Sequence, residues 1–380
     1  MLDENSIDEI TYKRWTHTDR SNLEVIVKSS EDFVESLIQM LQKYMKHNFI
    51  TKMQSSTYKM TKEDLKEGKM IVFCDFAENY SFVVQDEIQS FHWNNSMVTL
   101  HPFVGYYKDE DILKHVNFVS ISECNIHDSV SVHLFITQFL SHIKEKLPMI
   151  NKIIYYSDGC AAQYKNCKNF LNLCHHNEDF GINAEWNFFA TSQGKGPCDG
   201  LGGTVKRLAA KASLQRCAEG RNTEQILTAE AFFKFCKDNI KNIEFKYSTS
   251  VEYEKTSLKL KDRLEMALTI AGTQKLHCFR PVDKETVIVK EFTSSNEEYV
   301  KKVSSRCAES PVLDKDIHGY VLVAYLNDWY LGTVTNKDPI QKTLTVNFLH
   351  PKGPSKSFKY PDKEDVLDEI PFSDVHISQS

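Results

Sequence analysis

Several features are missing from this 380-residue chain, and each absence excludes a class of protein. No apolar run approaches the roughly 20 residues that a membrane-spanning helix needs, so no membrane contact is expected. The first ten residues, MLDENSIDEI, are polar and acidic, unlike a secretory signal. An excess of basic charge is missing too: the net charge is −6, so any surface that binds nucleic acid must be local.

Cysteines at metal-binding spacing are also missing. The ten cysteines are scattered, which is typical of reduced thiols in a cytosolic or nuclear protein. Cys160, Cys167 and Cys174 fall seven residues apart and precede His175 and His176. Zinc sites usually place their cysteines two to four residues apart, whereas seven-residue spacing marks one stripe of a helix. We therefore expect buried thiols and no zinc.

What is present is the composition of a soluble globular protein. Hydrophobic residues make up 41% of the chain and charged residues 26%. A length of 380 residues predicts two or three domains and is enough to bury a sizeable core.

The stretch NKIIYYSDGCAAQYKN, residues 151–166, organises the rest of the chain. Residues 153–156 form a short apolar run, which predicts a buried central strand. Asp158 and Gly159 follow as a turn, and a helix is expected over 161–175. A carboxylate at the C-terminal end of a buried strand lies where α/β sheets bind ligands. Ordinary turn chemistry explains the same pattern, so this motif alone does not establish a site.

Two further stretches place an acid at the end of an element. Residues 68–82, GKMIVFCDFAENYSF, combine an apolar strand with Asp75 at its far end. Residues 186–213 give a strand, a glycine-rich turn and a basic helix that Asp199 opens. Three such carboxylates are what a two-metal phosphoryl-transfer site needs, because Mg²⁺ prefers oxygen ligands.

The order of the expected elements predicts how these acids meet. Three antiparallel strands, then helix, strand, helix, strand and helix, is the ribonuclease-H-like order. We predict an α/β fold, a ribonuclease-H-like mixed sheet flanked by helices. The first strand would lie parallel to the strand at Ile153 after a right-handed crossover, so Asp75 and Asp158 would meet. The expected strands are 70–76, 80–91, 97–107, 115–122, 152–157 and 184–190, and the helices are 129–147, 161–175 and 199–217.

Four segments are expected along the chain. In the first, apolar residues at helical spacing predict a helix over Glu31–Met45 with Ser30 as its N-cap. Thr61 and Asp64 carry a small capping-box pattern. The segments are a helical N-terminal segment over 1–67, the ribonuclease-H-like core over 68–220, a helical or α+β extension and linker over 221–312, and a small C-terminal β-barrel over 313–372.

The barrel carries the pattern AYLNDWYLGTV at 324–334, which resembles Tudor and related SH3-like barrels. Its aromatics are candidates for a methyl-lysine cage, although most aromatics of so small a barrel must be core. A module that docks a protein or a histone tail is the simpler prediction. The aromatics are Tyr325, Trp329, Tyr330, Phe348 and Tyr360.

Three segments taken together resemble a known family. DFAENY at 75–80, SDGCAAQYKN at 157–166 and GKGPCDGLGGTVKR at 194–207 are similar to DDE/D-type transposase-like proteins of animal genomes. The set is specific, whereas each motif alone is not. The resemblance covers about residues 12–220 and the C-terminal module.

The resemblance implies a metal-dependent site that processes DNA. In such transposases three acids hold two divalent metals. Carried onto this chain, the catalytic and metal-binding residues would be Asp75, Asp158 and Asp199, with Mg²⁺ or Mn²⁺ as the cofactor. The family has a histidine before the GKG where this chain has Gln193, so the activity stays open. Downstream acids are alternatives for the third position: Glu219, Glu224 and Glu230.

A basic run surrounds the third acid. Phosphate contacts are the usual role of such a run beside a metal site, and a solvated helix face is the plainer alternative. The residues expected to bind nucleic acid are Lys195, Lys206, Arg207, Lys211, Gln163 and Lys165.

Three functions remain open on this basis. The first is a transposon-derived protein that cleaves DNA or transfers strands by two-metal chemistry. The second is a catalytically silent, domesticated protein that binds nucleic acid or chromatin, and the third is an interaction protein whose fold is only a scaffold. The expected partners are DNA and a protein or histone tail, a homo-oligomer stays open, and the expected location is nuclear. No zinc finger or helix-turn-helix for recognising transposon ends is visible, which leaves open a fragment of a longer protein.

Overall fold

A mixed sheet of ten strands is the centre of residues 1–305, one of two units into which the computed structural model divides. The second unit comprises residues 306–380. In the described part of the chain, no helix is both long enough and apolar enough to cross a bilayer. The structure describes residues 7–17, 21–83, 97–190, 196–218, 226–305, 319–325, 328–338, 341, 343–351, 358–361, 363–371 and 375–376.

The strands of the large sheet come from the whole length of the first unit. They are β3 (Lys69–Cys74), β4 (Ala77–Ser81), β5 (Met97–Asp109), β6 (Ile112–Ser122), β7 (Lys152–Ser157), β8 (Asn183–Phe188), β9 (Glu244–Ser248), β10 (Cys278–Pro281), β11 (Thr286–Lys290) and β12 (Tyr299–Lys302). Their order across the sheet is β12-β11-β10-β8-β7-β3-β5-β6-β9, and β4 pairs with β5. β3 and β7 lie side by side and parallel, which confirms the prediction for the two central strands.

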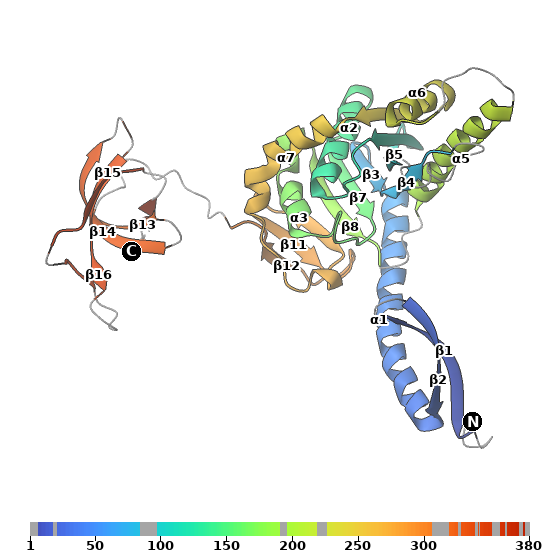
Figure 1. The fold of residues 1–380 in the computed structure, drawn as a ribbon, viewed down its shortest axis with the longest axis horizontal. Coiled ribbons are helices and arrows are strands. Elements are labelled where there is room, and N and C mark those ends of the chain that lie inside the picture. Colours follow the sequence, from blue (N-terminus) through green and yellow to red (C-terminus); the bar gives the residue numbers. More distant parts are fainter. Residues whose placement is uncertain are drawn as a thin grey trace. The chain divides into compact units, whose positions relative to one another are not determined.

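Helices cover both faces of the sheet (Figure 1). One face carries α2 (Ser129–Lys146), α3 (Cys167–Cys174), α4 (His176–Phe180) and α7 (Ser250–Glu265), and the other carries α5 (Pro197–Ala218), α6 (Ala229–Asn239) and the C-terminal half of α1 (Ser30–Glu63). Alternate strand residues point to opposite faces. In β3, Met70, Val72 and Cys74 belong to the core under α2, whereas Ile71 and Phe73 belong to the core under α1 and α5.

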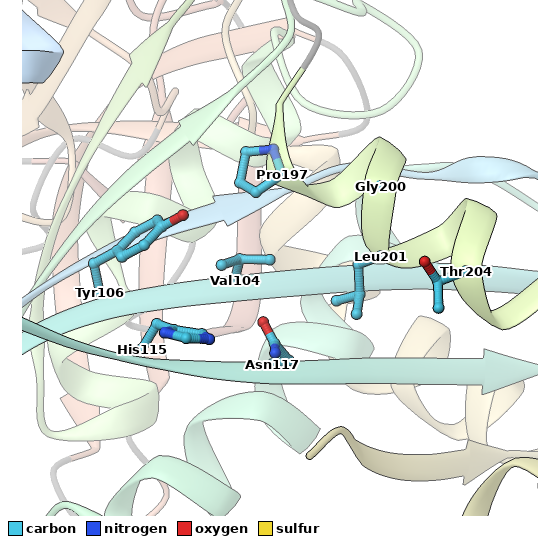
Figure 2. Close-up of a pocket in the computed structure, with 8 residues that line it drawn as sticks. All are labelled: Val104, Tyr106, His115, Asn117, Pro197, Gly200, Leu201 and Thr204. Atoms are coloured by element: carbon cyan, nitrogen blue, oxygen red, sulfur yellow. The ribbon is translucent and has the colours of Figure 1, made fainter. Parts of the chain in front are cut away.

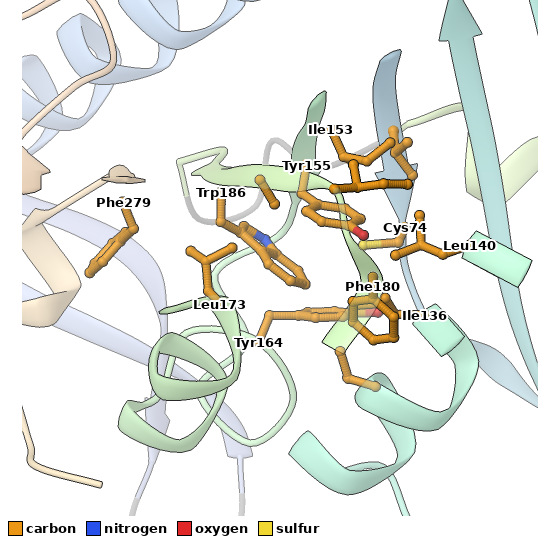
Figure 3. Packing of buried hydrophobic residues seen from close by; sticks show 14 of the residues in the cluster. Cys74, Ile136, Leu140, Ile153, Tyr155, Tyr164, Leu173, Phe180, Trp186 and Phe279 are labelled. Atoms are coloured by element: carbon orange, nitrogen blue, oxygen red, sulfur yellow. The ribbon is translucent and has the colours of Figure 1, made fainter. Parts of the chain in front are cut away.

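Aromatic rings fill the core on the α2 and α3 side (Figure 3). The rings of Tyr155 and Trp186 stack at 4.7 Å between centroids, and the indole Nε1 of Trp186 donates to Ser157 Oγ at 2.9 Å. Phe139 of α2 stacks on Phe103 of β5 at 4.7 Å with only 3° between the ring planes. These contacts join β7 to β8 and fix α2 against β5.

The N-terminal segment begins with two strands, so the prediction of an entirely helical segment is wrong. β1 (Glu9–His17) pairs antiparallel with β2 (Ser21–Ser29). β-branched and aromatic residues alternate with polar ones here, which favours strands. Tyr12 and Ile26 are direct partners on the face toward α1, where the ring of Tyr12 contacts Phe33 at 5.3 Å.

α1 starts one residue earlier than predicted and runs past the predicted capping box. The side chain of Ser29, rather than Ser30, accepts from the backbone N–H of Asp32. Thr61 lies in the last turn, and its hydroxyl donates to the carbonyl of Thr57 at 2.8 Å. No helix can start there, because the backbone is already helical.

Gln54 fastens the C-terminal half of α1 to the sheet. Its side chain is buried at 1% exposure. The amide Nε2 donates to the carbonyl of Phe188 at 2.8 Å, and Oε1 accepts from the backbone N–H of Thr293 at 2.8 Å. A buried amide with both ends bonded ties α1, β8 and the segment after β11 together.

Three further predictions need correction. The helix expected over 161–175 begins only at Cys167, because the side chain of Asn166 accepts from Asn169 N–H at 3.0 Å and caps it there. The segment 221–312 is not a separate extension, since β9 adds to β6 at one edge of the sheet and β10 adds to β8 at the other. The strand expected over 80–91 corresponds in part to β4, which ends at Ser81. Residues 84–91 lie outside the described residues.

The second unit contains a separate antiparallel sheet in the order β18-β15-β14-β13-β19. Its elements are β13 (Tyr320–Tyr325), β14 (Asp328–Asp338), β15 (Thr343–Phe348), β18 (Val366–Pro371) and β19 (Val375–His376), with β16 (His350–Pro351) paired to β17 (Phe358–Lys359). Its small core includes Val323, Val346 and Phe348. Of the cage candidates, Tyr330 and Tyr360 are each 45% exposed, and the side chains of Tyr325 and Trp329 lie outside the described part.

Replacing Phe139 by Ala should destabilise the first unit by about 3–5 kcal/mol, the usual cost of removing a buried phenyl ring. Phe139 is 0% exposed and stacks on Phe103. Urea unfolding followed by circular dichroism measures the change. Leu258→Ala is the control, because Leu258 is 74% exposed and its loss should change the free energy of unfolding by less than about 0.5 kcal/mol. Equal effects of the two variants would contradict the assignment of this core.

Candidate metal centre

Asp75 and Asp158 follow neighbouring parallel strands at the same level of the sheet. β3 pairs with β7 from Lys69 opposite Lys152 to Phe73 opposite Tyr156. Two residues beyond that last pair, the same register brings Asp75 opposite Asp158. Neighbouring strands lie about 4.8 Å apart, and residues at matching positions project to the same face. The predicted meeting of these two acids therefore follows from the strand register.

The carboxyl of Asp75 is half-buried and lies among other acids. Burial and the charges of Asp158 and Asp199 together raise its pKa from 3.8 to about 7, against a hydrogen bond from the backbone of Phe76 that acts to lower it. No lysine or arginine of the described residues is among these influences. The site therefore holds negative charge that a cation would neutralise.

Asp158 is held by the turn that follows it. Its Oδ1 accepts from the backbone N–H of Cys160 at 3.1 Å, and the hydroxyl of Ser157 donates to the carbonyl of Asp158 at 3.0 Å. Burial raises the pKa of the Asp158 carboxyl, and the Cys160 hydrogen bond lowers it. This local bond fixes one carboxylate oxygen and leaves the other for a ligand.

Asp199 stands in the first turn of α5 and is exposed. The preceding residue, Cys198, is buried, and its Sγ donates to the carbonyl of Pro102 on β5 at 3.6 Å. α5 is thereby fixed on the sheet with Asp199 near enough for its charge to act on Asp75.

Of the alternatives for the third acid, the structure describes only Glu230, and it is less well placed than Asp199. Glu230 lies in the first turn of α6, where its charge acts on Tyr247 of β9 at the far edge of the sheet. Glu219 and Glu224 lie outside the described residues, and so does Gln193. Among the described acids named for this role, Asp199 is therefore the better third candidate.

A neutral pair of side chains that the sequence analysis missed lies beneath the acids. His101 and Tyr164 are both 0% exposed, and His101 Nε2 and the Tyr164 hydroxyl are 2.8 Å apart. Burial lowers the pKa of His101 to about 3. Burial, with the nearby charges of Asp75 and Asp158 among others, raises the pKa of Tyr164 well above its usual value. A signal was available, because Thr99 and His101 are polar residues inside the apolar first part of β5, residues 97–104.

The predicted nucleic-acid contacts separate into exposed and occupied groups. Arg207 and Lys211 are exposed on α5, while Lys206 is half-buried and donates to the carbonyl of Glu78 at 3.0 Å. Lys165 is only 7% exposed and donates to the carbonyl of Gln274 at 3.1 Å, so its ammonium does not lie on the surface.

The two other predicted contacts contribute little to this surface. Gln163 is half-buried and belongs to the turn before α3. Lys195 lies outside the described residues.

Burial also lowers the pKa of Lys165 to about 8. Its stem passes Gly159, where an added Cβ would lie 3.5 Å from the Lys165 Cδ. Lys165 therefore packs beneath the turn after Asp158.

A pocket of about 450 Å³ opens beside the first turn of α5 (Figure 2). Pro197 and Gly200, which flank Asp199 in sequence, form one wall, and side chains of β5 and β6 form the floor. The ring of Tyr106 carries the Lys62 ammonium 3.6 Å from its centroid. The pocket is lined by Val104, Tyr106, His115, Asn117, Pro197, Gly200, Leu201 and Thr204.

The buried members of the cysteine and histidine series at 160–176 pack in the core and bond within the protein. The Sγ of Cys174 donates to the carbonyl of Thr286 at 3.7 Å. The ring of His176 lies 3.0 Å from the Tyr155 hydroxyl through Nε2 and 2.7 Å from the Ile182 carbonyl through Nδ1. Both ring nitrogens of His176 are therefore occupied within the protein.

The donor set suits a hard cation but does not yet surround one. Mg²⁺ usually takes one or two carboxylates and completes its shell with water and phosphate oxygens. Asp75 and Asp158 supply two carboxylates at one sheet edge, and Asp199 adds a third charge nearby. Within the described residues, however, no three His, Cys, Asp or Glu side chains lie close enough to enclose a metal ion. A metal ion at this edge would have to take its remaining ligands from water or a substrate.

Two family models match the chain. The model described as a domain of unknown function (DUF8701) matches residues 54–293, which is more than half of the chain. A second, also described as a domain of unknown function (DUF8700), matches residues 1–45. Comparison with curated proteins and with solved structures gave no match.

Replacing Asp75 by Asn should stabilise the metal-free protein at high pH and not at low pH. The folded pKa of about 7 lies above the ordinary 3.8, so the contribution of this carboxyl is full below about pH 4 and is lost as the pH rises through 7. One pKa unit corresponds to about 1.4 kcal/mol, so the gain at pH 8 should be about 2–4 kcal/mol. Urea unfolding in a chelator at pH 4 and pH 8 measures it. The exposed Asp262→Asn is the control, and an equal gain at both pH values would contradict the effect.

Proposed function

This chain belongs to the family of the domain of unknown function DUF8701, and we propose that Asp75 and Asp158 form the anchor of a two-metal site that cleaves or joins DNA. The parallel register of β3 and β7 carries the proposal, because it sets two half-buried carboxylates side by side. Like charges in such a position oppose each other unless a cation is bound. A bound metal would explain why two acids lie together although no cationic side chain of the described residues lies beside Asp75.

The fold supports the same function. Two antiparallel neighbours, β5 and β6, follow β3, and the chain then returns through α2 to β7, parallel to β3. This is the arrangement expected for a ribonuclease-H-like core. The acids lie at the carboxyl ends of the central strands, where α/β sheets bind their ligands.

Each residue has a distinct task in this proposal. Two Mg²⁺ or Mn²⁺ ions, when bound, stabilise the attacking and the leaving oxygen of an in-line displacement. Asp75 is fixed by the end of β3 and would hold metal there. Asp158 is oriented by the Cys160 N–H. Asp199, exposed on α5, closes the site from the helix side once DNA is bound. Tyr164 and His101 stay neutral and keep water from the rear of the acids.

DNA would lie along α5 in this proposal. Arg207 and Lys211 follow Asp199 by two and three turns, which is about 12 Å and 18 Å along the helix axis. Both are exposed, so they can contact phosphates without leaving another partner. A nuclear location and a transposon origin would fit this function.

A catalytically silent protein that binds nucleic acid is the second candidate, and two observations favour it. The chain has Gln193 where the transposase-like family that its sequence resembles has histidine. The described acids do not enclose a metal ion without further movement. In that case the fold and the basic face of α5 persist as a binding surface.

The second unit would serve as a docking module for a protein partner. Its antiparallel sheet fits the predicted Tudor or SH3-like barrel. Tyr330 and Tyr360 expose nearly half of their surface, whereas Phe348 is part of the core. Exposed aromatics suit a peptide ligand, a histone tail included.

Asp75→Asn and Asp158→Asn should each abolish metal-dependent DNA processing. Loss of a ligand that positions the metal should lower the rate about 100-fold or more, since metal stabilisation of the transition state is worth several kcal/mol. Nicking of supercoiled plasmid and strand transfer with labelled oligonucleotides measure the rate with Mg²⁺, with Mn²⁺ and with chelator. The matched control is Asp262→Asn, which should keep the full rate.

The outcomes separate the two candidate functions. Equal turnover by the parent and Asp75→Asn would remove Asp75 from the mechanism. No turnover in the parent, together with intact DNA binding, would favour the silent protein. Gln193→His introduces the histidine of the family that the sequence resembles, and a gain of turnover in this variant would locate the defect.

Arg207 and Lys211 should bind DNA mainly through phosphate, so their joint replacement by Ala should weaken binding and flatten its salt dependence. On duplex DNA the slope of log K against log salt should fall by roughly 0.9 for each lost contact. The control is the double Ala variant of Lys255 and Lys259, which are exposed on α7 on the opposite face of the sheet. Fluorescence anisotropy at several salt concentrations measures both. An unchanged slope in the α5 variant would contradict the interface.

A further inference from the structure

The N-terminal half of α1 carries an apolar stripe that no described residue covers. Its members are Val34, Ile38, Leu41 and Met45, which are 37%, 51%, 45% and 67% exposed. They are spaced four, three and four residues apart, which places them on one side of the helix like the a and d positions of a coiled coil. We call these four residues the α1 stripe.

The strand pair β1–β2 uses a different side of the helix. Phe33 contacts the ring of Tyr12, and the Lys28 ammonium donates to Ser36 Oγ at 2.6 Å. Phe33 is one residue from Val34, and Ser36 is two residues from both Val34 and Ile38, so neither lies on the side of the helix that carries the α1 stripe. The strands therefore do not shield the stripe. An exposed apolar surface of this length is unusual for a helix that stays unpaired in water.

The spacing of the α1 stripe reads the same in both directions along the helix. A second copy running antiparallel would place Val34 opposite Met45 and Ile38 opposite Leu41. A two-fold axis would pass midway between Ile38 and Leu41. Both copies would then present the same surface to each other, as a closed dimer requires.

The charges along α1 favour the antiparallel direction. Glu31, Asp32 and Glu35 form an acidic segment at the start of the helix, and Lys43 and Lys46 form a basic segment further on. An antiparallel pair brings the acidic segment of each copy to the basic segment of the other. A parallel pair would bring like charges together, which opposes association.

The distances agree with this pairing. The acidic and basic segments are separated by about 12 residues, or about 18 Å of helix, which is the length of the α1 stripe. Lys46 contacts Glu291 Oε1 at 2.9 Å within the chain and remains 60% exposed. Its ammonium can therefore also contact a carboxylate in the acidic segment of the second copy.

We propose that the chain forms a homodimer in which two α1 helices pack antiparallel through the α1 stripe. The partner is a second copy of this chain, because the stripe and the charges complement themselves. The match of one family model to residues 1–45 and of another to residues 54–293 agrees with an N-terminal module of separate role. The stripe is short, so the dissociation constant is expected in the micromolar range. This inference does not depend on the chemistry at Asp75.

Leu41→Glu should abolish the dimer. The full chain is measured by sedimentation velocity and light scattering between about 1 and 100 μM, where the parent should shift from monomer to dimer. A charge at the centre of the two-fold interface should raise the dissociation constant about 100-fold or more. Gln39→Glu is the matched control, since Gln39 is exposed, lies off the stripe and receives the same charge. It should change the constant less than about 3-fold, and circular dichroism should show both variants folded.

Cysteine cross-linking tests the direction of the helices. Val34→Cys mixed with Met45→Cys should give a cross-linked dimer under mild oxidation, and Val34→Cys alone should give little more than the parent with its native cysteines. A parent that stays monomeric at 100 μM would overturn the proposal. A dimer that Leu41→Glu leaves intact would overturn it as well and point to another surface, such as the exposed outer face of β2. Efficient cross-linking of Val34→Cys with itself would overturn the antiparallel arrangement.

Discussion

The parallel pairing of β3 with β7 is the constraint on which the rest of the first unit depends. Phe73 and Tyr156, the last pair of this register, stack their rings at 5.8 Å and hold the two strand ends together. The ring of Tyr58 from α1 packs edge-on against both. This aromatic cluster lies directly before the two acids. The same packing contacts therefore determine the strand pairing, the docking of α1 and the position of the carboxylates.

The acids belong to elements of different kinds, and this affects what the site can do. Asp75 and Asp158 follow buried strands whose backbones are fixed by their neighbours. Asp199 stands on an exposed helical turn that one buried residue, Cys198, fastens to β5. Two carboxylates at fixed strand ends and one on an exposed helical turn suit the proposed site, which a substrate would complete.

The sequence predicted those elements whose signals are local. The apolar run before Ser157 gave the observed bounds of β7, and Asp75 and Asp158 could be paired from strand order alone. The strand pair β1–β2 was missed because the helical pattern that follows it was extended to the N-terminus. The pairing of His101 with Tyr164 could not be predicted, since it joins residues far apart in sequence through a buried contact. The third acid stays the least determined for the same reason.

Because α1 is continuous, the way its C-terminal half is held determines the direction in which its N-terminal half points. One uninterrupted helix runs from Ser30 to Glu63, and Gln54 locks its rotation against the sheet. Each residue turns a helix by about 100° and advances it by about 1.5 Å. The number of residues between Met45 and Gln54 therefore sets the angular phase of the N-terminal arm. One inserted residue would swing the arm to another side of the molecule, whereas seven would return it to within about 20°.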